Sequence, residues 1–214
     1  MNKIGIIGSG NVGQNLGSGF IKLGYKVKIG SREPGKLNDW VKKSGDNASS
    51  GSFEEVAKFG EIIVVCTKHD GTENAINLAR KINFKDKIII DVTNPLLFEN
   101  ENSLPKLAVG YPESAGSKLQ EILSGSKVVK AFNIVTANYM TNAKLKQGTP
   151  DMFICGNDKE AKKIVSEIAR KWSWEVTDIG GIEQAYLLES LAMLWIRYGF
   201  LNNHWTHAFK LLKE

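Results

Sequence analysis

The residues with the clearest capacity for chemistry form a glycine-rich segment near the start of the chain. The G-x-G-x-x-G spacing follows an apolar run at residues 3–7, in the order Gly8, Ser9, Gly10, Asn11, Val12, Gly13. In such a turn the first glycine permits the bend, the second lets a pyrophosphate approach the backbone, and the third lets a helix pack on the strand. The unpaired N–H groups of the helix favour phosphate. These six residues predict a dinucleotide site; a turn without a ligand is the alternative.

A second group of side chains distinguishes between the two nicotinamide dinucleotides. A strand expected at residues 26–29 ends in Gly30, Ser31 and Arg32, and Lys36 follows one helical turn later. An NAD site places Asp or Glu at this strand end to bind the ribose 2′-hydroxyl. A hydroxyl, a guanidinium and an ammonium instead suit a 2′-phosphate. Ser31, Arg32 and Lys36 therefore favour NADP(H). Without the glycine turn they would be interpreted as a solvated basic loop.

Polar residues follow three further strands of the expected sheet. Ligands of open parallel sheets lie beyond the carboxyl ends of the strands, so these residues are expected near the nicotinamide. They are Thr67, Lys68, His69, Asn94 and Asn133. His69 is either an acid/base group or a wall of the cleft, and the two asparagines either bind the carboxamide or cap turns. We assign no catalytic residue. We also predict no metal site, because the pair His204 and His207 has no obvious third ligand.

Short apolar runs alternate with helical patterns along most of the chain. Strands are expected at residues 3–7, 26–29, 62–66, 87–91, 127–132, 152–155 and 175–178. Most are continuously apolar, as in strands covered on both faces. Helices are expected from Val12, from the capping-box sequence at 52–55, from Asp70 and over 161–171. This order predicts an α/β fold, a doubly wound Rossmann fold with a mostly parallel sheet. Residues 44–52 are expected to form a solvated loop, and residues 94–111 an irregular one.

Length and composition bound the remaining possibilities. The chain has 214 residues, 42% hydrophobic, with a formal charge of +5. We expect a cofactor-binding domain at 1–180 and a C-terminal helical segment at 181–214, helical over 183–212 and rich in aromatic residues. The small charge excess argues against nucleic acid, and the lack of a run of about 20 apolar residues argues against a membrane span. Cys66 and Cys155 lie in apolar runs, as buried thiols do, and the N-terminus lacks a signal-peptide pattern. Both features predict a cytoplasmic protein.

Five motifs occur in an order that resembles the NADPH-dependent F420 reductase family. They are residues 8–13, residues 30–32, VVKAFN at 128–133, MFICGND at 152–158 and LLESLAMLWI at 187–196. More broadly, they resemble the oxidoreductase domain of the STEAP metalloreductases. The resemblance implies a Rossmann domain with a C-terminal helical hairpin. It implies NADP(H) bound at 9–12, Ser31, Arg32 and Lys36, and near the turns of His69 and Ala137. A deazaflavin (F420) or a flavin (FMN or FAD) would stack on the nicotinamide.

Three functions remain open at this stage. The first is an NADPH-dependent oxidoreductase that transfers hydride to F420, a flavin or another small electrophile. Such a transfer needs positioning more than acid/base help. The second is a non-enzymatic NADPH-binding redox sensor. The third is an imine or ketone reductase related to pyrroline-5-carboxylate reductase. The aromatic C-terminal segment is expected to form a core or a homodimer interface. In the redox sensor it would instead be a partner-binding face.

Overall fold

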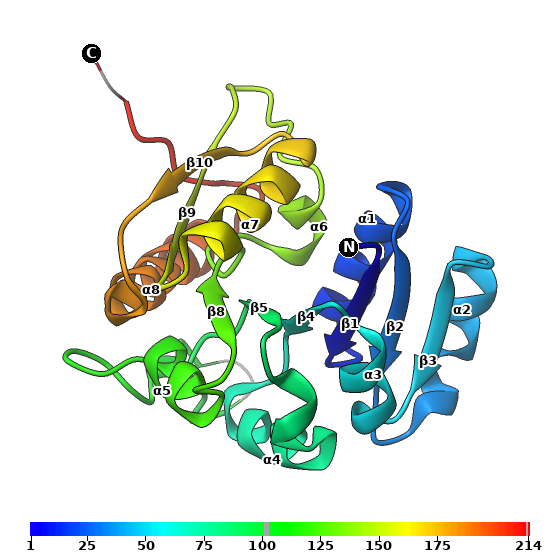
Figure 1. Cartoon of the computed structure of the whole chain (residues 1–214). Coiled ribbons are helices and arrows are strands. Elements are labelled where there is room, and N and C mark those ends of the chain that lie inside the picture. The colour runs from blue at the N-terminus through cyan, green and yellow to red at the C-terminus, as the bar shows by residue number, and fades with distance from the viewer. Residues whose placement is uncertain (101–102, 213) are drawn as a thin grey trace.

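The computed structural model describes residues 1–100, 103–212 and 214. Its centre is an eight-stranded sheet in the order β10-β9-β8-β5-β4-β1-β2-β3 (Figure 1). All neighbouring strands are parallel except β8 and β9, which are antiparallel. The predicted doubly wound, mostly parallel fold is therefore confirmed. The strands are β1 (Lys3–Ile7), β2 (Lys26–Gly30), β3 (Ala48–Gly51), β4 (Ile62–Val65), β5 (Ile88–Asp91), β8 (Lys127–Lys130), β9 (Asp151–Gly156) and β10 (Glu175–Asp178).

Helices cover both faces of the sheet and bury two apolar cores. The first core includes side chains of α1 (Asn11–Lys22), α2 (Asn38–Ser44), α6 (Ala137–Met140) and α7 (Lys159–Lys171). The second includes α3 (Phe53–Phe59), α4 (His69–Ala79) and α5 (Ala115–Ile122). The last helix, α8 (Ala185–Asn202), contributes Leu188 to the second core and Ala192 to the first. Short 3₁₀ turns η1 (Pro34–Leu37), η2 (Lys81–Phe84) and η3 (Ile182–Gln184) complete the chain path.

The capping box is confirmed, because Ser52 Oγ accepts from the N–H of Glu55 and the Glu55 carboxylate accepts from the N–H of Ser52.

Two segments expected to be loops contain strands. The expectation of a loop over 44–52 was wrong for β3, whose small polar residues pair with β2 at the sheet edge. An edge strand needs no apolar alternation, so its sequence resembles that of a loop. Within residues 94–111, β6 (Leu96–Leu97) and β7 (Lys106–Leu107) form a short antiparallel hairpin.

The C-terminal helix is shorter than expected. It ends at Asn202, and the next residue, Asn203, has a left-handed φ of 45°, so the prediction of helix to residue 212 was wrong. Residues 203–212 instead form a tail beside β9. The backbone N–H of Asp151 donates to Phe209 O at 2.9 Å, and the N–H of Leu211 donates to the Asp151 carboxylate at 3.0 Å. Among the described residues, no helix is long and apolar enough to span a membrane.

Candidate functional site

Two glycines of the G-x-G-x-x-G turn are required by the protein's own packing. Gly8 directly follows β1 with a φ of +131°. A Cβ atom there would lie 2.8 Å from the carbonyl oxygen of Cys66 and 2.9 Å from its sulfur. A Cβ atom at Gly13 would collide with the carbonyl oxygen of Gly8. Gly8 therefore permits the bend after β1, and Gly13 allows α1 to pack closely against that bend.

Gly10 behaves differently from the other two glycines. Its φ of −75° suits any residue, and a Cβ atom there would meet nothing within 4 Å. The protein itself therefore gives no reason for a glycine at this position. Gly10 is the N-cap of α1, which has no side-chain cap and no acidic residue in its first turn. Open space above an uncapped helix N-terminus fits a phosphate group that approaches from outside. Ser9, Asn11 and Val12 flank this space along the chain.

The ends of β1 and β2 meet through two serines. Ser9 Oγ donates to Ser31 Oγ at 3.3 Å, and Ser31 Oγ also accepts from the N–H of Glu33 at 3.1 Å. Arg32 is exposed and forms no ion pair with any residue in the described part of the chain. Lys36, in contrast, pairs with Glu33 at 2.9 Å. Arg32 can thus contact a 2′-phosphate directly and Ser31 can donate its own hydroxyl hydrogen, whereas Lys36 must first release Glu33.

Asn94 and Asn133 are held together at the ends of β5 and β8. Asn94 Nδ2 donates to the backbone oxygen of Asn133 at 2.8 Å. Asn133 Nδ2 donates to Asn94 Oδ1 at 2.9 Å and to Leu188 O at 3.0 Å, which fixes the orientation of its amide. Asn133 Oδ1 is buried and has no hydrogen-bond partner among the residues that the structure describes. A buried acceptor of this kind needs a donor, and the amide of a nicotinamide ring is one that fits.

The remaining predicted residues are spread along the same edge of the sheet. Thr67 Oγ1 lies 2.8 Å from Thr72 Oγ1, and the exposed Lys68 is the N-cap of α4. His69 begins α4 and lines a cavity of about 320 Å³, together with Thr93 and Ala115 among others. Ala137 begins α6, which lies against α1 through the bond from Asn15 to Asn138 at 3.3 Å. The structure therefore brings the predicted residues to one edge, but within its described ranges the His69 ring has no hydrogen-bonded partner for acid/base work.

A buried charged cluster beneath this edge escaped the sequence analysis. Lys130, at the end of β8, contacts the carboxylates of Asp91 on β5 and Glu189 on α8, and all three side chains are buried. The signal was present, because a charged residue ends each of the apolar runs IIID and VVK. The contact between these residues was not predictable from the sequence, since Asp91 and Lys130 are 39 positions apart on two strands and Glu189 lies on the helix α8. Buried charges persist only when paired and hydrogen-bonded.

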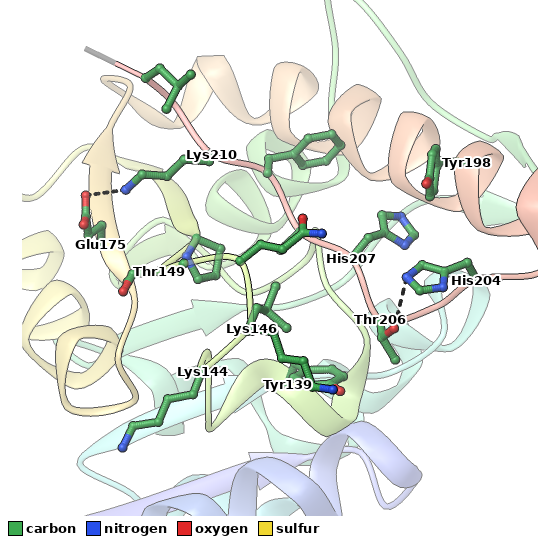
Figure 2. A pocket seen from close by; sticks show the side chains of 17 residues that line it. Tyr139, Lys144, Lys146, Thr149, Glu175, Tyr198, His204, Thr206, His207 and Lys210 are labelled. Carbon is green, nitrogen blue, oxygen red and sulfur yellow. Dashed lines mark hydrogen bonds and ion pairs between the residues drawn. The ribbon is translucent and has the colours of Figure 1, made fainter. Parts of the chain in front are cut away.

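A larger cavity of about 920 Å³ lies apart from the predicted residues (Figure 2). It is enclosed by the segment between α6 and β9, the end of α8 and the C-terminal tail, and none of the sequence-predicted site residues lines it. Lys210 reaches Glu175 at 2.7 Å and His204 lies 3.1 Å from Thr206 Oγ1. His204 and His207 were expected on a helix but lie in the tail, beyond the end of α8.

Comparison with known proteins agrees with this geometry. Residues 3–95 match the family described as NADP oxidoreductase, coenzyme F420-dependent. An F420-dependent NADP reductase from Methanocaldococcus jannaschii is 27% identical over 205 residues, 91% of each protein. Metalloreductase STEAP3 from Rattus norvegicus is 28% identical over 191 residues, 89% of this chain and 36% of its own length. The crystal structure of a proposed F420-dependent NADP reductase from Arthrobacter sp. FB24 has a TM-score of 0.92 at 28% identity, and the match covers 100% of both chains.

The fold and the glycine turn define a Rossmann-type domain with the glycine spacing of dinucleotide-binding proteins. Within that class, the chain is related to the F420-dependent NADP reductases. The resemblance noted in the sequence is therefore confirmed. The chain spans about a third of the length of the STEAP metalloreductases that it matches.

Proposed function

We propose that this protein transfers hydride between NADP(H) and a deazaflavin (F420) or a flavin such as FMN or FAD. The observation that carries the proposal is the open space at Gly10 among the described residues, at a helix N-terminus whose N-cap residue has no capping side chain. It supports binding of a pyrophosphate at this turn. The acceptor is proposed from those relatives alone.

Each part of the site has a defined task in this proposal. The backbone from Gly8 to Gly13 binds the pyrophosphate, and Ser31 with Arg32 binds the 2′-phosphate. Asn133 Oδ1 accepts from the carboxamide, while Asn94 holds its side chain in place. The residues Thr67, Lys68, His69 and Ala137 form the walls of the cleft. When bound, the reduced nicotinamide supplies the hydride, so these residues bind, orient and exclude water. We assign no acid or base to the transfer.

The test is to mix the purified protein with NADPH and one acceptor at a time. The acceptors are F420, FMN, FAD and a cyclic imine, and the loss of NADPH absorbance is followed. The proposal requires oxidation with F420 or a flavin, at a rate that depends on protein concentration. Oxidation with the imine alone would favour the imine reductase alternative. NADPH binding without oxidation by any acceptor would favour the redox sensor. Absence of NADPH binding would refute the proposed function outright.

We further propose that two copies of the chain pair through α8. Leu187, Leu194 and Leu201 are exposed at 45%, 58% and 68% and are spaced by seven residues along one side of the helix. The stripe is symmetric about Leu194, so antiparallel pairing centred there would pack Leu187 against Leu201 of a second copy. A two-fold interface requires such self-complementarity. Sedimentation of the parent protein and of Leu194→Glu tests this: a dimer that becomes a monomer is expected, whereas a monomeric parent would refute it.

A cytoplasmic location is also proposed. Its support is chemical, because Cys66 and Cys155 are both free thiols. Reduced cysteines are typical of reducing compartments, in which disulfides rarely persist. Fractionation of the native source with an antibody against the chain would test it, and recovery in an oxidising compartment would refute it.

A further inference from the structure

The Asp91–Lys130–Glu189 cluster lies between the sheet and the helices α5 and α8. Lys130 Nζ lies 2.8 Å from Asp91 Oδ2 and 2.9 Å from Glu189 Oε1, and it donates to the backbone oxygen of Thr93 at 2.8 Å. These three contacts use all three hydrogens of an ammonium group, so Lys130 is fully satisfied as a cation. Although burial lowers the pKa of Lys130, the two carboxylates outweigh it and hold that pKa above its usual value.

The other hydrogen-bond partners of the two carboxylates are backbone N–H groups and one hydroxyl. The Glu189 carboxylate accepts from the N–H of Ala115 at 3.1 Å and from the N–H of Gly116 at 3.0 Å. Asp91 Oδ1 accepts from the N–H of Thr93 at 2.9 Å and from its hydroxyl at 2.7 Å. Each of these partners is a donor, which suits a carboxylate rather than a protonated acid. Two carboxylates and one ammonium give the cluster a formal charge of −1.

This cluster adjoins the residues that the proposed function assigns to the nicotinamide end of the cofactor site. Asn94 follows Asp91 by three residues and Asn133 follows Lys130 by three. Thr93 and Ala115, which bond to the cluster, also line the cavity of about 320 Å³. The N-terminus of α5 offsets part of the charge, because two of its N–H groups point at Glu189. The remaining charge is deeply buried, so salt screens it poorly.

We propose that this cluster biases the site toward the oxidised cofactor. The nicotinamide ring is cationic in NADP⁺ and neutral in NADPH, so a net negative charge nearby stabilises only the first. The inference rests on the proposed function, since it requires the dinucleotide to bind at this edge. Between unit charges about 10 Å apart, at an effective dielectric constant of about 20, the interaction corresponds to about a tenfold change in an equilibrium constant. For a two-electron couple, a tenfold preference lowers the potential of the bound cofactor by about 30 mV.

The test is calorimetric titration of the whole protein with NADP⁺ and with NADPH, without any acceptor. Glu189→Gln removes one negative charge while it keeps a side-chain oxygen for the N–H groups. We expect the ratio of the two dissociation constants to shift toward NADPH by about three- to tenfold. The shift should persist in concentrated salt. Glu61→Gln is the matched control: it makes the same chemical change at the amino ends of β1 and β4, where Glu61 accepts from Asn2 and Lys3, and should leave the ratio unchanged.

The design separates a charge effect from structural damage. Damage to the site weakens both forms of the cofactor alike, so equal losses in a folded Glu189→Gln variant would overturn the inference. Asp91→Asn is the second variant and should shift the ratio in the same direction. The unaltered protein gives an independent measurement: it should bind NADP⁺ at least as tightly as NADPH, and a clear preference for NADPH would overturn the inference even if neither variant folds. Failure of the parent to bind either form would refute the proposed function instead.

Discussion

Trp195 and His207 are joined by two reciprocal hydrogen bonds. Trp195 Nε1 donates to the backbone oxygen of His207 at 2.8 Å, and His207 Nε2 lies 3.0 Å from the backbone oxygen of Trp195. Because a carbonyl oxygen only accepts, Nε2 carries the hydrogen. The two rings are also stacked, with centroids 4.5 Å apart and planes inclined by 17°. This pair ties the C-terminal tail to α8.

Trp195→Phe tests the value of this pair for stability. It keeps an aromatic ring but leaves the His207 carbonyl without its donor, so we expect a loss of about 1–2 kcal/mol in the free energy of unfolding. Denaturant unfolding measures the loss. Trp205→Phe is the control, because Trp205 is 38% exposed and its change should stay within about 0.5 kcal/mol. Equal losses in the two variants would contradict a special role for Trp195.

Gly10→Ala tests the phosphate position at the glycine turn. The added methyl group meets no protein atom within 4 Å, so the fold should survive with little change in the free energy of unfolding. It would occupy the space proposed for the pyrophosphate, so NADPH affinity should fall at least tenfold. Titration and thermal unfolding of the same sample check both expectations. Gly110→Ala is the control, since a Cβ atom there is equally free and should leave NADPH affinity intact. Unchanged affinity in Gly10→Ala would refute the assignment.

Arg32→Ala tests the choice of coenzyme. A charge-assisted contact to the 2′-phosphate contributes about 1.5–3 kcal/mol, so NADPH binding should weaken by about 10- to 150-fold. NADH lacks that phosphate and should change by only a few-fold. Lys36→Ala should weaken NADPH less than Arg32→Ala, because Lys36 gives up its ion pair with Glu33 to bind phosphate. Titration of both dinucleotides decides this: equal losses for NADPH and NADH would make Arg32 structural.

Thiol reactivity tests the packing behind the glycine turn. Burial raises the pKa of Cys66 to about 12, and burial is also the main cause that raises the pKa of Cys155 to about 12. At pH 8 only about one thiol in ten thousand is then ionised, against roughly a quarter for an ordinary cysteine. A chromogenic thiol reagent should therefore find no reactive thiol in the folded protein and two after denaturation. Rapid reaction of the folded protein would contradict the raised pKa values of Cys66 and Cys155.

Glu55 gives a pH-dependent prediction. Hydrogen bonds from the backbone N–H and the hydroxyl of Ser52 lower the pKa of Glu55 below its ordinary value of 4.5. A lowered folded pKa adds stability above the unfolded pKa, and that stability is lost as the pH falls through the folded value. Glu55→Gln should thus be less stable than the parent at pH 7, and the difference should shrink toward zero in acid. Denaturant unfolding at several pH values measures it, and a difference that does not vary with pH would contradict the capping role.

Features that depend on residues close together in the sequence were predicted, whereas contacts between residues far apart in the sequence were missed. The glycine turn and the capping box depend on residues a few positions apart, so both were identified before the structure. The Lys130 cluster could not be, because its members come from β5, β8 and α8 and meet only through the sheet order. The tail was misassigned for a related reason. Its aromatic residues suit a helix, but the hydrogen bonds that Asp151 and Trp195 donate to it hold it in a non-helical conformation.

The reversal of direction between β8 and β9 separates the larger cavity from the glycine turn. Because β9 runs against its neighbour, its start lies beyond the end of β8, where the tail bonds to Asp151. The walls of the larger cavity therefore come from residues 139–150, Glu175 and the last part of the chain. The family match ends at residue 95, before any of these segments. Substitutions in these walls should therefore leave the glycine turn undisturbed, so the larger cavity and the dinucleotide turn can be altered separately.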